Sequence, residues 1–414
     1  MNKILLLGGK PIGSVELVEK AHEKGLYVIV TDYLSKEESP AKSVADETWE
    51  ISTAEIDLLA EKCREEKVNG VISGVHEFNI EKGILLSKEL GLRSFSTIEQ
   101  WKKCDNKQEF KKECKKCGLR VSEEYSLETI RQEDFPVICK PADSSGSKGF
   151  SICRSKDELD KGYQHALDFS PGKKVLIEKY QPYESVIIHY TVIEGEAFFS
   201  GMSDKNSLQI EDGGKVMAFQ TFHSRHIREF YNALDGKIKK LISNLEIVNG
   251  FIWIEAFDNN GEFIMNEMGF RLGGSLTNYP VAYYTGFDQL SFMLDIALGN
   301  PNTQPVPLLD VEDRRKYAIL PLHVKPGTIK SVNGIEAIKS NRNVYSFVQV
   351  HYPGDVIHNW KSAQQVFCYL HLLYESNKDL KSTIEEVTNT LSVIDENGRN
   401  ILFRMFPTSA ISEE

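Results

Sequence analysis

Two apolar segments between residues 251 and 269 constrain the fold of this chain more than any other feature. They flank Asp258-Asn259-Asn260-Gly261, and an Asn-Gly pair between apolar segments is typical of a β-hairpin. Each predicted strand carries one acid among apolar residues, Glu255 on the first and Glu267 on the second. A carboxylate in such a strand is unfavourable unless a cation pairs with it. The hairpin therefore indicates either two solvated or salt-bridged acids, or a site for a cation.

The two acids share a face of the hairpin only if the strand register allows it, or if a bulge shifts the register. Gly261 could supply such a bulge through a positive φ. Two converging carboxylates would form a hard oxygen site suited to Mg²⁺ that also binds phosphates. Arg271 follows four residues after Glu267, and an arginine there could bind phosphate or carboxylate bidentately.

Length and charge limit the class of protein. The chain has 414 residues, which favours two to three domains, and a net charge of −11. The negative net charge argues against nucleic acid or a membrane surface as a partner. The first residues are too short an apolar run for a signal peptide, and no run of 18 apolar residues occurs. Seven scattered cysteines fit a reducing compartment, so we expect a cytoplasmic protein.

The first 97 residues alternate short apolar strands with helices, as in a parallel α/β sheet of four to five strands. The turn at residues 8–13 is rich in glycine but lacks a Walker lysine and a GxGxxG pattern, so a tight βα turn is favoured over a cofactor site. Ligands bind at the carboxyl ends of strands in such sheets. The loop at residues 73–77 is therefore either a substrate-side loop or a helix cap.

Residues 136–153 form the second informative stretch. A strand at 136–140 leads into a Ser/Gly-rich loop and then into a strand at 150–153. Backbone amides and hydroxyls of such a loop can fold over a triphosphate as a flap. Lys140 ends an apolar strand, where its ammonium group needs an anion. The alternative is a mobile hairpin tip with one lysine that reaches solvent.

The remaining pattern predicts a hairpin at 185–202, a mobile polar loop at 204–218 and a helix at 230–245. A further helix at 287–298 precedes a Pro/Asn-rich boundary at 300–307. The last hundred residues indicate an α+β unit in which short strands precede helices at 363–374 and 380–391. His223 and His226 could act as a base, or could simply precede a helix.

Together these segments resemble the ATP-grasp superfamily, and within it the carboxylate–amine ligases. The resemblance covers nearly the whole chain and depends on the order and spacing of its motifs. It implies a pre-ATP-grasp parallel α/β domain at residues 1–97, a two-lobed ATP-grasp region at 98–305 with its flap lobe at about 122–180, and an α+β domain at 306–414. It also implies ATP and Mg²⁺ as cofactors, with Mn²⁺ as a possible substitute, and a possible homodimer.

The resemblance assigns roles to individual residues. It implies that Glu255 and Glu267 bind the metal, and that Arg271 and Lys140 contact the reacting groups. The residues implied to bind the nucleotide are Lys107, Lys140, Ser144, Ser145, Gly146, Ser147, Gly149, Glu178, Lys179, Tyr180, Glu184 and Met265.

One position departs from the family pattern. The family usually shows Glu-x-Asn-x-Arg, with the asparagine as a further metal ligand, whereas this chain has Gly269 at that position. Glycine has no side-chain oxygen, so Asn266 or Asn278 could supply one instead.

The implied activity is an ATP-dependent ligase that joins a small carboxylate to an amine through an acyl phosphate and releases ADP and phosphate. The flap and the 204–218 loop would shield the acyl phosphate from water. Two alternatives stay open at this point, a purine-pathway ligase acting on a ribose phosphate and a non-catalytic ATP-binding protein.

Overall fold

The N-terminal part of the chain is a four-stranded parallel sheet covered by helices. The computed structural model describes residues 1–142, 149–209, 215–301, 303–358 and 365–403, with 408 and 411. The sheet order is β3-β2-β1-β4, and all three strand pairs are parallel. This confirms the predicted α/β unit. Its elements are β1 (Lys3–Leu7), α1 (Ser14–Glu23), β2 (Tyr27–Thr31), α2 (Pro40–Val44), β3 (Glu47–Trp49), α3 (Ile56–Glu66), β4 (Gly70–Ser73) and α4 (Glu77–Leu90).

Asp32, at the end of β2, organises the glycine-rich turn after β1. Its carboxylate accepts the Gly9 amide at 2.7 Å and the Ser39 hydroxyl at 2.8 Å. The fully buried Lys42 ammonium lies 3.0 Å from the same carboxylate and also donates to two backbone carbonyls. Because the Gly9 amide is used inside the protein, the turn serves the α/β packing, as the sequence favours.

Two short helices lead into a small second sheet. Asn106 separates α5 (Ile98–Asp105) from α6 (Lys107–Lys116), and its side chain accepts the amides of Gln108 and Glu109. The sheet order β5-β8-β6-β7 confirms that β6 and β7 flank the Ser/Gly-rich loop as an antiparallel pair. The elements are β5 (Glu124–Tyr125), a 3₁₀ turn (Gln132–Asp134), β6 (Val137–Pro141), β7 (Ser151–Cys153), α7 (Lys156–Asp168) and β8 (Val175–Lys179).

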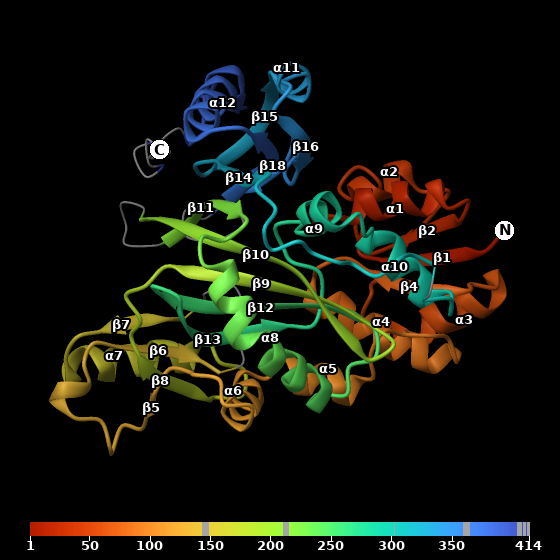
Figure 1. The fold of residues 1–414 in the computed structure, drawn as a ribbon. Helices are drawn as coiled ribbons and strands as arrows, with labels where there is room; N and C mark the ends of the chain where they lie inside the picture. Colours follow the sequence, from red (N-terminus) through yellow and green to blue (C-terminus); the bar gives the residue numbers. More distant parts are fainter. Residues whose placement is uncertain are drawn as a thin grey trace.

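An eight-stranded sheet forms the centre of the molecule and continues into the C-terminal part. Its order is β13-β12-β9-β10-β11-β14-β18-β16. Figure 1 shows the β5–β8 lobe and the N-terminal sheet on opposite sides of strands β9, β12 and β13. The elements up to residue 297 are β9 (Ser185–Ile193), β10 (Glu196–Gln209), β11 (Lys215–Phe222), α8 (Ile227–Asn244), β12 (Gly250–Asn259), β13 (Glu262–Gly269), α9 (Asn278–Thr285) and α10 (Gln289–Ala297).

The C-terminal part adds three strands to this sheet and a smaller sheet above it. The smaller sheet has the order β17-β15-β19. The elements are β14 (Lys316–His323), β15 (Gly327–Asn333), α11 (Ile335–Lys339), β16 (Val344–Gln349), β17 (Val356–Ile357), β18 (Val366–Tyr374), α12 (Asn377–Thr390) and β19 (Ser392–Asp395).

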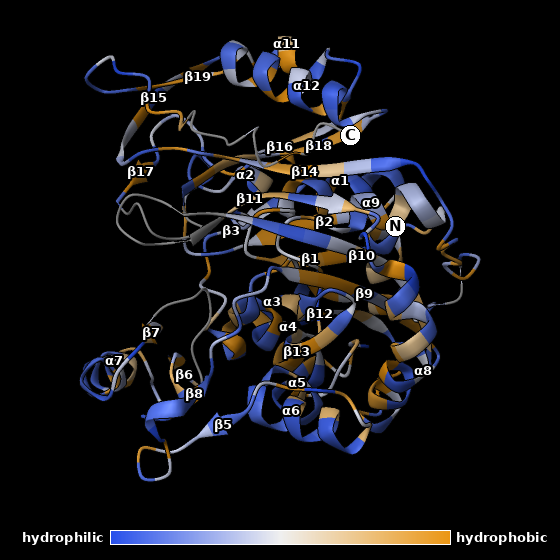
Figure 2. Cartoon of the chain, turned by 60° about the vertical axis from the view of Figure 1, so that its left-hand side comes forward, coloured by the Kyte–Doolittle hydropathy of each residue, from blue (hydrophilic) through white to orange (hydrophobic). Residues whose placement is uncertain are grey.

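Two sequence predictions about this sheet were wrong. The predicted loop at 204–218 is strand over residues 204–209 and 215–218, because residues 203–209 of β10 pair with residues 215–222 of β11. The hydrophilic residues of β10, which colour part of its ribbon blue in Figure 2, concealed the strand. The predicted helix at 363–374 is β18 over residues 366–374, because that apolar run is paired on both sides, with β14 and β16.

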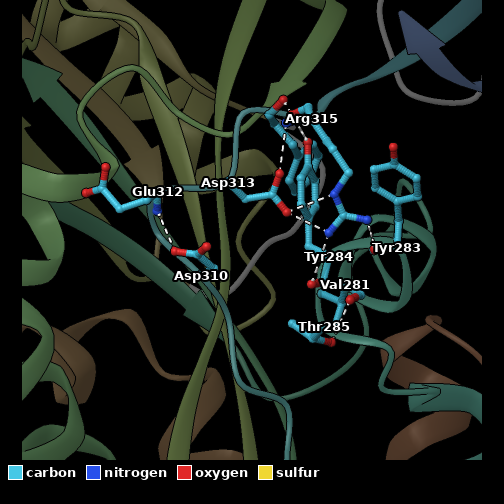
Figure 3. Close-up of polar contacts among 9 residues, drawn as sticks. Val281, Tyr283, Tyr284, Thr285, Asp310, Glu312, Asp313 and Arg315 are labelled. Atoms are coloured by element: carbon cyan, nitrogen blue, oxygen red, sulfur yellow. Dashed lines mark hydrogen bonds and ion pairs between the residues drawn. The ribbon is translucent and has the colours of Figure 1, made fainter.

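Arg315 fixes the connection between α10 and β14. Its guanidinium pairs with Asp313 at 2.6 Å, donates to the Tyr283 carbonyl of α9 at 2.9 Å and lies 4.5 Å from the Tyr283 ring centre (Figure 3). This contact anchors the segment after the predicted boundary at 305. Among the residues that the structure describes, no helix is both long and apolar enough to cross a membrane.

Replacing Lys42 tests the role of the Asp32 cluster. In Lys42→Met the Asp32 carboxylate stays buried without its cation, which typically costs about 3–5 kcal/mol. We expect a lower thermal midpoint, measured by circular dichroism. The matched control is Lys36→Met in the same connection, since the Lys36 side chain is exposed. Equal midpoints for the two variants would contradict this role.

Candidate functional site

The predicted hairpin brings Glu255 and Glu267 together. Asn260 and Gly261 have φ of 51° and 87°, which is the two-residue turn that an Asn-Gly pair favours. Glu255 and Glu267 are direct cross-strand partners. The register then shifts, so that Asn266 is an extra residue on β13. The bulge thus lies beside the acids, not at Gly261, and it places both Asn266 and Glu267 opposite Glu255.

A cleft of about 500 Å³ surrounds this acid pair. It lies between the β5–β8 lobe, the β12–β13 hairpin and helices α4 to α6. The residues predicted for the site that line it are Lys107, Lys140, Glu178, Lys179, Glu255, Glu267 and Arg271. The sequence therefore identified residues from several elements that converge on one cleft.

Lys205 is the cation that pairs with Glu255. Its ammonium group on β10 lies 2.9 Å from Glu255 Oε1, and the Asn266 amide donates to Oε2 at 2.9 Å. Burial alone would raise the pKa of Glu255, but the charge and hydrogen bond of Lys205 outweigh burial and lower the pKa to about 2. Glu255 is thus ionised at neutral pH in spite of its burial.

Glu267 is paired with Lys107. The two side chains lie 3.6 Å apart, and 31% of the Glu267 side chain is exposed toward the cleft. Lys107 reaches this position because it is the first residue of α6, directly after the Asn106 cap. The sequence did not predict that the helix is interrupted at Asn106. This interruption places Lys107, a residue that the sequence did predict for the site, at the start of α6.

Lys140 connects the β5–β8 lobe to the hairpin. Its ammonium group lies 3.1 Å from Glu178 on β8 and 3.4 Å from the Asn266 side-chain oxygen. Lys111 of α6 pairs with the same Glu178 at 2.5 Å. Burial favours a protonated Glu178, but the two lysines outweigh it and lower its pKa. Glu178 thus orients Lys140 at the edge of the cleft.

The other residues predicted to bind the nucleotide are placed in different ways. Lys179 lines the cleft while its ammonium donates to the Asp134 carbonyl at 2.8 Å. Tyr180 and Glu184 are held by backbone hydrogen bonds and do not line the cleft. Met265, on β13, is fully buried in the core, whereas Met268 of the same strand lines the cleft.

Part of the predicted flap lies outside the described residues, namely Ser144, Ser145, Gly146 and Ser147. Gly149 is described and has a φ of 72°. A Cβ there would lie 2.5 Å from the Phe169 side chain, so both the backbone and the available space favour glycine at the end of the flap.

Arg271 is held on three sides at the far end of the cleft. Its guanidinium donates to Glu77 at 2.9 Å and to the Leu272 carbonyl at 3.0 Å, and it lies 5.1 Å from the Trp253 ring centre. Asp105 lies close by, and burial together with the Glu77 carboxylate raises its pKa. This end of the cleft therefore combines a fixed guanidinium with two acids.

Trp253 explains the glycine at position 269. The two residues are cross-strand partners, and a Cβ on residue 269 would lie 2.3 Å from the indole ring. The indole thus occupies the space that an asparagine side chain would need. Asn266, not residue 269, brings an amide to the acid pair, whereas Asn278 does not line the cleft.

His223 and His226 each contact another side chain outside the cleft. His226 Nδ1 lies 2.6 Å from the buried Asp258 carboxylate, and the His223 ring stacks on Tyr284 with centres 4.4 Å apart. Neither side chain lines the cleft. Their predicted role as a base gains no support from this placement.

Sequence reasoning missed Lys205, Asp105 and Trp253. Lys205 lay in the supposed loop, and Asp105 is an ordinary acid at a helix end. Trp253 carried a signal, because it stands two residues before Glu255 in the hairpin, and side chains two apart share a face of a strand.

The acid pair fits a divalent metal ion. Magnesium commonly binds one or two carboxylates together with substrate phosphates and water. Glu255 and Glu267 provide two carboxylates on one side of the cleft, and each is now paired with a lysine. Among the described residues no cluster of three or more His, Cys, Asp or Glu side chains forms a closed metal site.

Lys205→Met tests the pairing with Glu255. Without the ammonium group, the two carboxylates should bind Mn²⁺ more tightly in the absence of nucleotide, by about tenfold, because a competing charge at contact distance is gone. Isothermal titration calorimetry measures this affinity, with the exposed Lys240→Met as the control. Weaker Mn²⁺ binding would instead mean that Lys205 holds Glu255 in its binding position.

Gly269→Ala tests the packing of Trp253. The added methyl group overlaps the indole, and such overpacking typically costs about 1–3 kcal/mol. We expect a lower unfolding midpoint in urea, and recovery in the double variant Gly269→Ala/Trp253→Leu. A Gly269→Ala variant as stable as the parent would show that the indole moves aside freely.

Comparisons with known proteins agree with this geometry. Residues 103–304 match the family described as carbamoyl-phosphate synthase L chain, ATP binding domain. A formate-dependent phosphoribosylglycinamide formyltransferase from Methanocaldococcus jannaschii is 24% identical over 282 residues, which cover 65% of this chain and 69% of that protein. Other formyltransferases of this name match over about half of their length, 52% and 53% in two cases.

Two solved structures share the fold over almost the whole chain. An L-amino acid ligase from Bacillus licheniformis has a TM-score of 0.73 at 17% identity and covers 96% of this chain and 100% of that one. A biotin carboxylase from Campylobacter jejuni, solved as an ATP-analogue complex, has a TM-score of 0.78 at 15% identity and covers 99% and 95%. The predicted fold class is thereby confirmed, and the chain is similar to ATP-grasp ligases in sequence over residues 103–304 and in fold over almost its whole length.

Proposed function

We propose that this chain uses ATP to join a small carboxylate to an amine, with an acyl phosphate as the intermediate. The observation that carries the proposal is the convergence of three cations, Lys107, Lys140 and Arg271, around the paired carboxylates of Glu255 and Glu267. Phosphoryl transfer needs mainly positioning and charge neutralisation, and this arrangement supplies both.

The chemistry follows from the leaving groups. A carboxylate oxygen attacks the γ-phosphorus of ATP, the bond to the β-phosphate oxygen breaks, and ADP leaves. The amine then attacks the acyl carbon, inorganic phosphate leaves, and the amine loses a proton as the amide forms. No side-chain nucleophile is required for either step.

In this proposal some residues of the cleft bind the phosphates and others bind the substrate carboxylate. Lys107 and Lys140 lie where they can neutralise the transferred phosphoryl group, and Arg271 lies where it can orient the carboxylate. Mg²⁺, or Mn²⁺ in its place, would be held by Glu255 and Glu267 and would neutralise charge on the phosphates. Glu178 keeps Lys140 in position through the ion pair at 3.1 Å.

The substrate end of the cleft favours an amine over a ribose phosphate. Glu77 and Asp105 lie beside Arg271, and burial and Glu77 raise the pKa of Asp105. The Glu77 carboxylate would repel a phosphate dianion but attract an ammonium group, and the Asp105 carboxyl group could accept a hydrogen bond from that ammonium group. The relative named as a formyltransferase acts on phosphoribosylglycinamide, whereas the structural neighbour is named as an L-amino acid ligase. An amino acid as one substrate therefore fits this end better.

The non-catalytic alternative loses its main support. It rested on the missing asparagine at position 269, and the packing of Trp253 accounts for the glycine there. Asn266 contributes an amide to the acid pair instead.

Glu267→Ala and Lys140→Ala should each reduce ATP turnover by at least a hundredfold while the fold is kept, because each removes charge from the centre of the cleft. The measurement is phosphate release with Mg-ATP across amino acids and small carboxylates, singly and in pairs. Lys174→Met, on an exposed residue of the same lobe, is the control. Release that needs no second substrate, or near-normal release from either variant, would refute the ligase.

A further inference from the structure

A small apolar cavity lies next to the substrate end of the cleft. It has a volume of about 40 Å³ and is lined by residues of β4, α4, β12 and α10. Arg271 lines both this cavity and the main cleft. The side chains that give the cavity its apolar wall are Val71, Ile72, Ile80, Ile84, Phe95, Phe251, Leu272, Met293, Ile296 and Ala297.

Arg271, which lines both the cavity and the cleft, has a guanidinium whose orientation is fixed. Trp253 lies against the Arg271 guanidinium, Glu77 accepts one of its hydrogen bonds, and the Leu272 carbonyl accepts another. Leu272, the next residue, forms part of the cavity wall. A carboxylate bound by Arg271 would therefore have its substituent close to the apolar wall.

We propose that this cavity receives the apolar side chain of the amino acid whose carboxylate Arg271 binds. The inference rests on the proposed ligase function and names the substrate class of the same site. Arg271 recognises the carboxylate, Glu77 and Asp105 recognise the ammonium group, and the cavity selects the side chain. Short aliphatic side chains fit, because one water-sized group needs about 10–15 Å³ of such space.

Two neighbouring residues of α4 allow the cavity to be changed in opposite directions. Gly83 lines it, and a Cβ there would have its nearest neighbours at 3.7 and 3.8 Å, on Leu7 and Ser73. Gly83→Ala is thus sterically tolerated and makes the cavity smaller. Ile84 is 3% exposed and also lines the cavity, so Ile84→Ala makes it larger.

The test is the ratio of kcat/KM values for ADP release with glycine, alanine, valine, leucine and phenylalanine as the varied substrate. A methylene group in such a pocket is worth at least about tenfold in kcat/KM. We expect Gly83→Ala to shift the preference toward smaller side chains by about tenfold. Ile84→Ala should shift it toward larger ones by a similar factor. ATP affinity should stay unchanged in both.

Leu86→Ala is the matched control, because Leu86 of α4 is buried in a core cluster with Leu59 and Cys63 of α3 and does not line the cavity. It should lower stability without altering the preference. If the parent protein releases ADP with amino acids but neither cavity variant alters the ratio, the subsite is refuted and the ligase stands. If no amino acid in the series stimulates ADP release, both the amino-acid subsite and the proposed substrate class are refuted.

Discussion

The site depends on the pairing of carboxylates with lysines that come from other elements. Glu255 can stay ionised within the sheet because Lys205 reaches it from β10, and Glu178 can do so because Lys111 and Lys140 reach it from α6 and β6. Each pair relieves the cost of a buried charge, and each also joins two elements. Lys140 also lies at hydrogen-bonding distance from Asn266, so a polar contact at the cleft connects the β5–β8 lobe to the β12–β13 hairpin. The ion pairs that stabilise buried carboxylates thus also bring Lys140 to the edge of the cleft, where the proposed function places the nucleotide.

The packing of Trp253 against Gly269 accounts for the missing asparagine side chain at position 269. The indole takes the space of a side chain at position 269 and forms a platform for Arg271. The amide that such a side chain could have contributed comes from Asn266, at the bulge. A glycine that suggests loss of function in the sequence therefore has a steric cause, and it improves the placement of an arginine.

The sequence predicted the hairpin, its turn, both acids and Lys140, because each carries a local signal of its own, whereas Lys107 was named only through the family resemblance. The sequence did not predict the role of Lys205, since a polar strand such as the end of β10 has no hydrophobic alternation, and Lys205 lies in a strand because β10 pairs there with both β9 and β11. The prediction of a helix at 363–374 was wrong because that segment is uniformly apolar, not because it is polar. A uniformly apolar run does not distinguish a buried helix from a strand that is paired on both sides. The bulge position depends on how two strands pair, and no single residue encodes it.

Arg271 joins two parts of the chain that have different tasks. Toward the acid pair it faces residues of the nucleotide region, and through Glu77 it contacts the N-terminal domain at the carboxyl end of β4. Parallel sheets place their ligands at that edge, so the N-terminal domain meets the cleft where a substrate is expected. In the proposed function, changes in β4 and α4 would therefore alter which substrate is bound while Lys107 and Lys140 stay in place. The proposed substrate recognition and the proposed phosphoryl transfer come from separate parts of the sequence, and Arg271 lies between them.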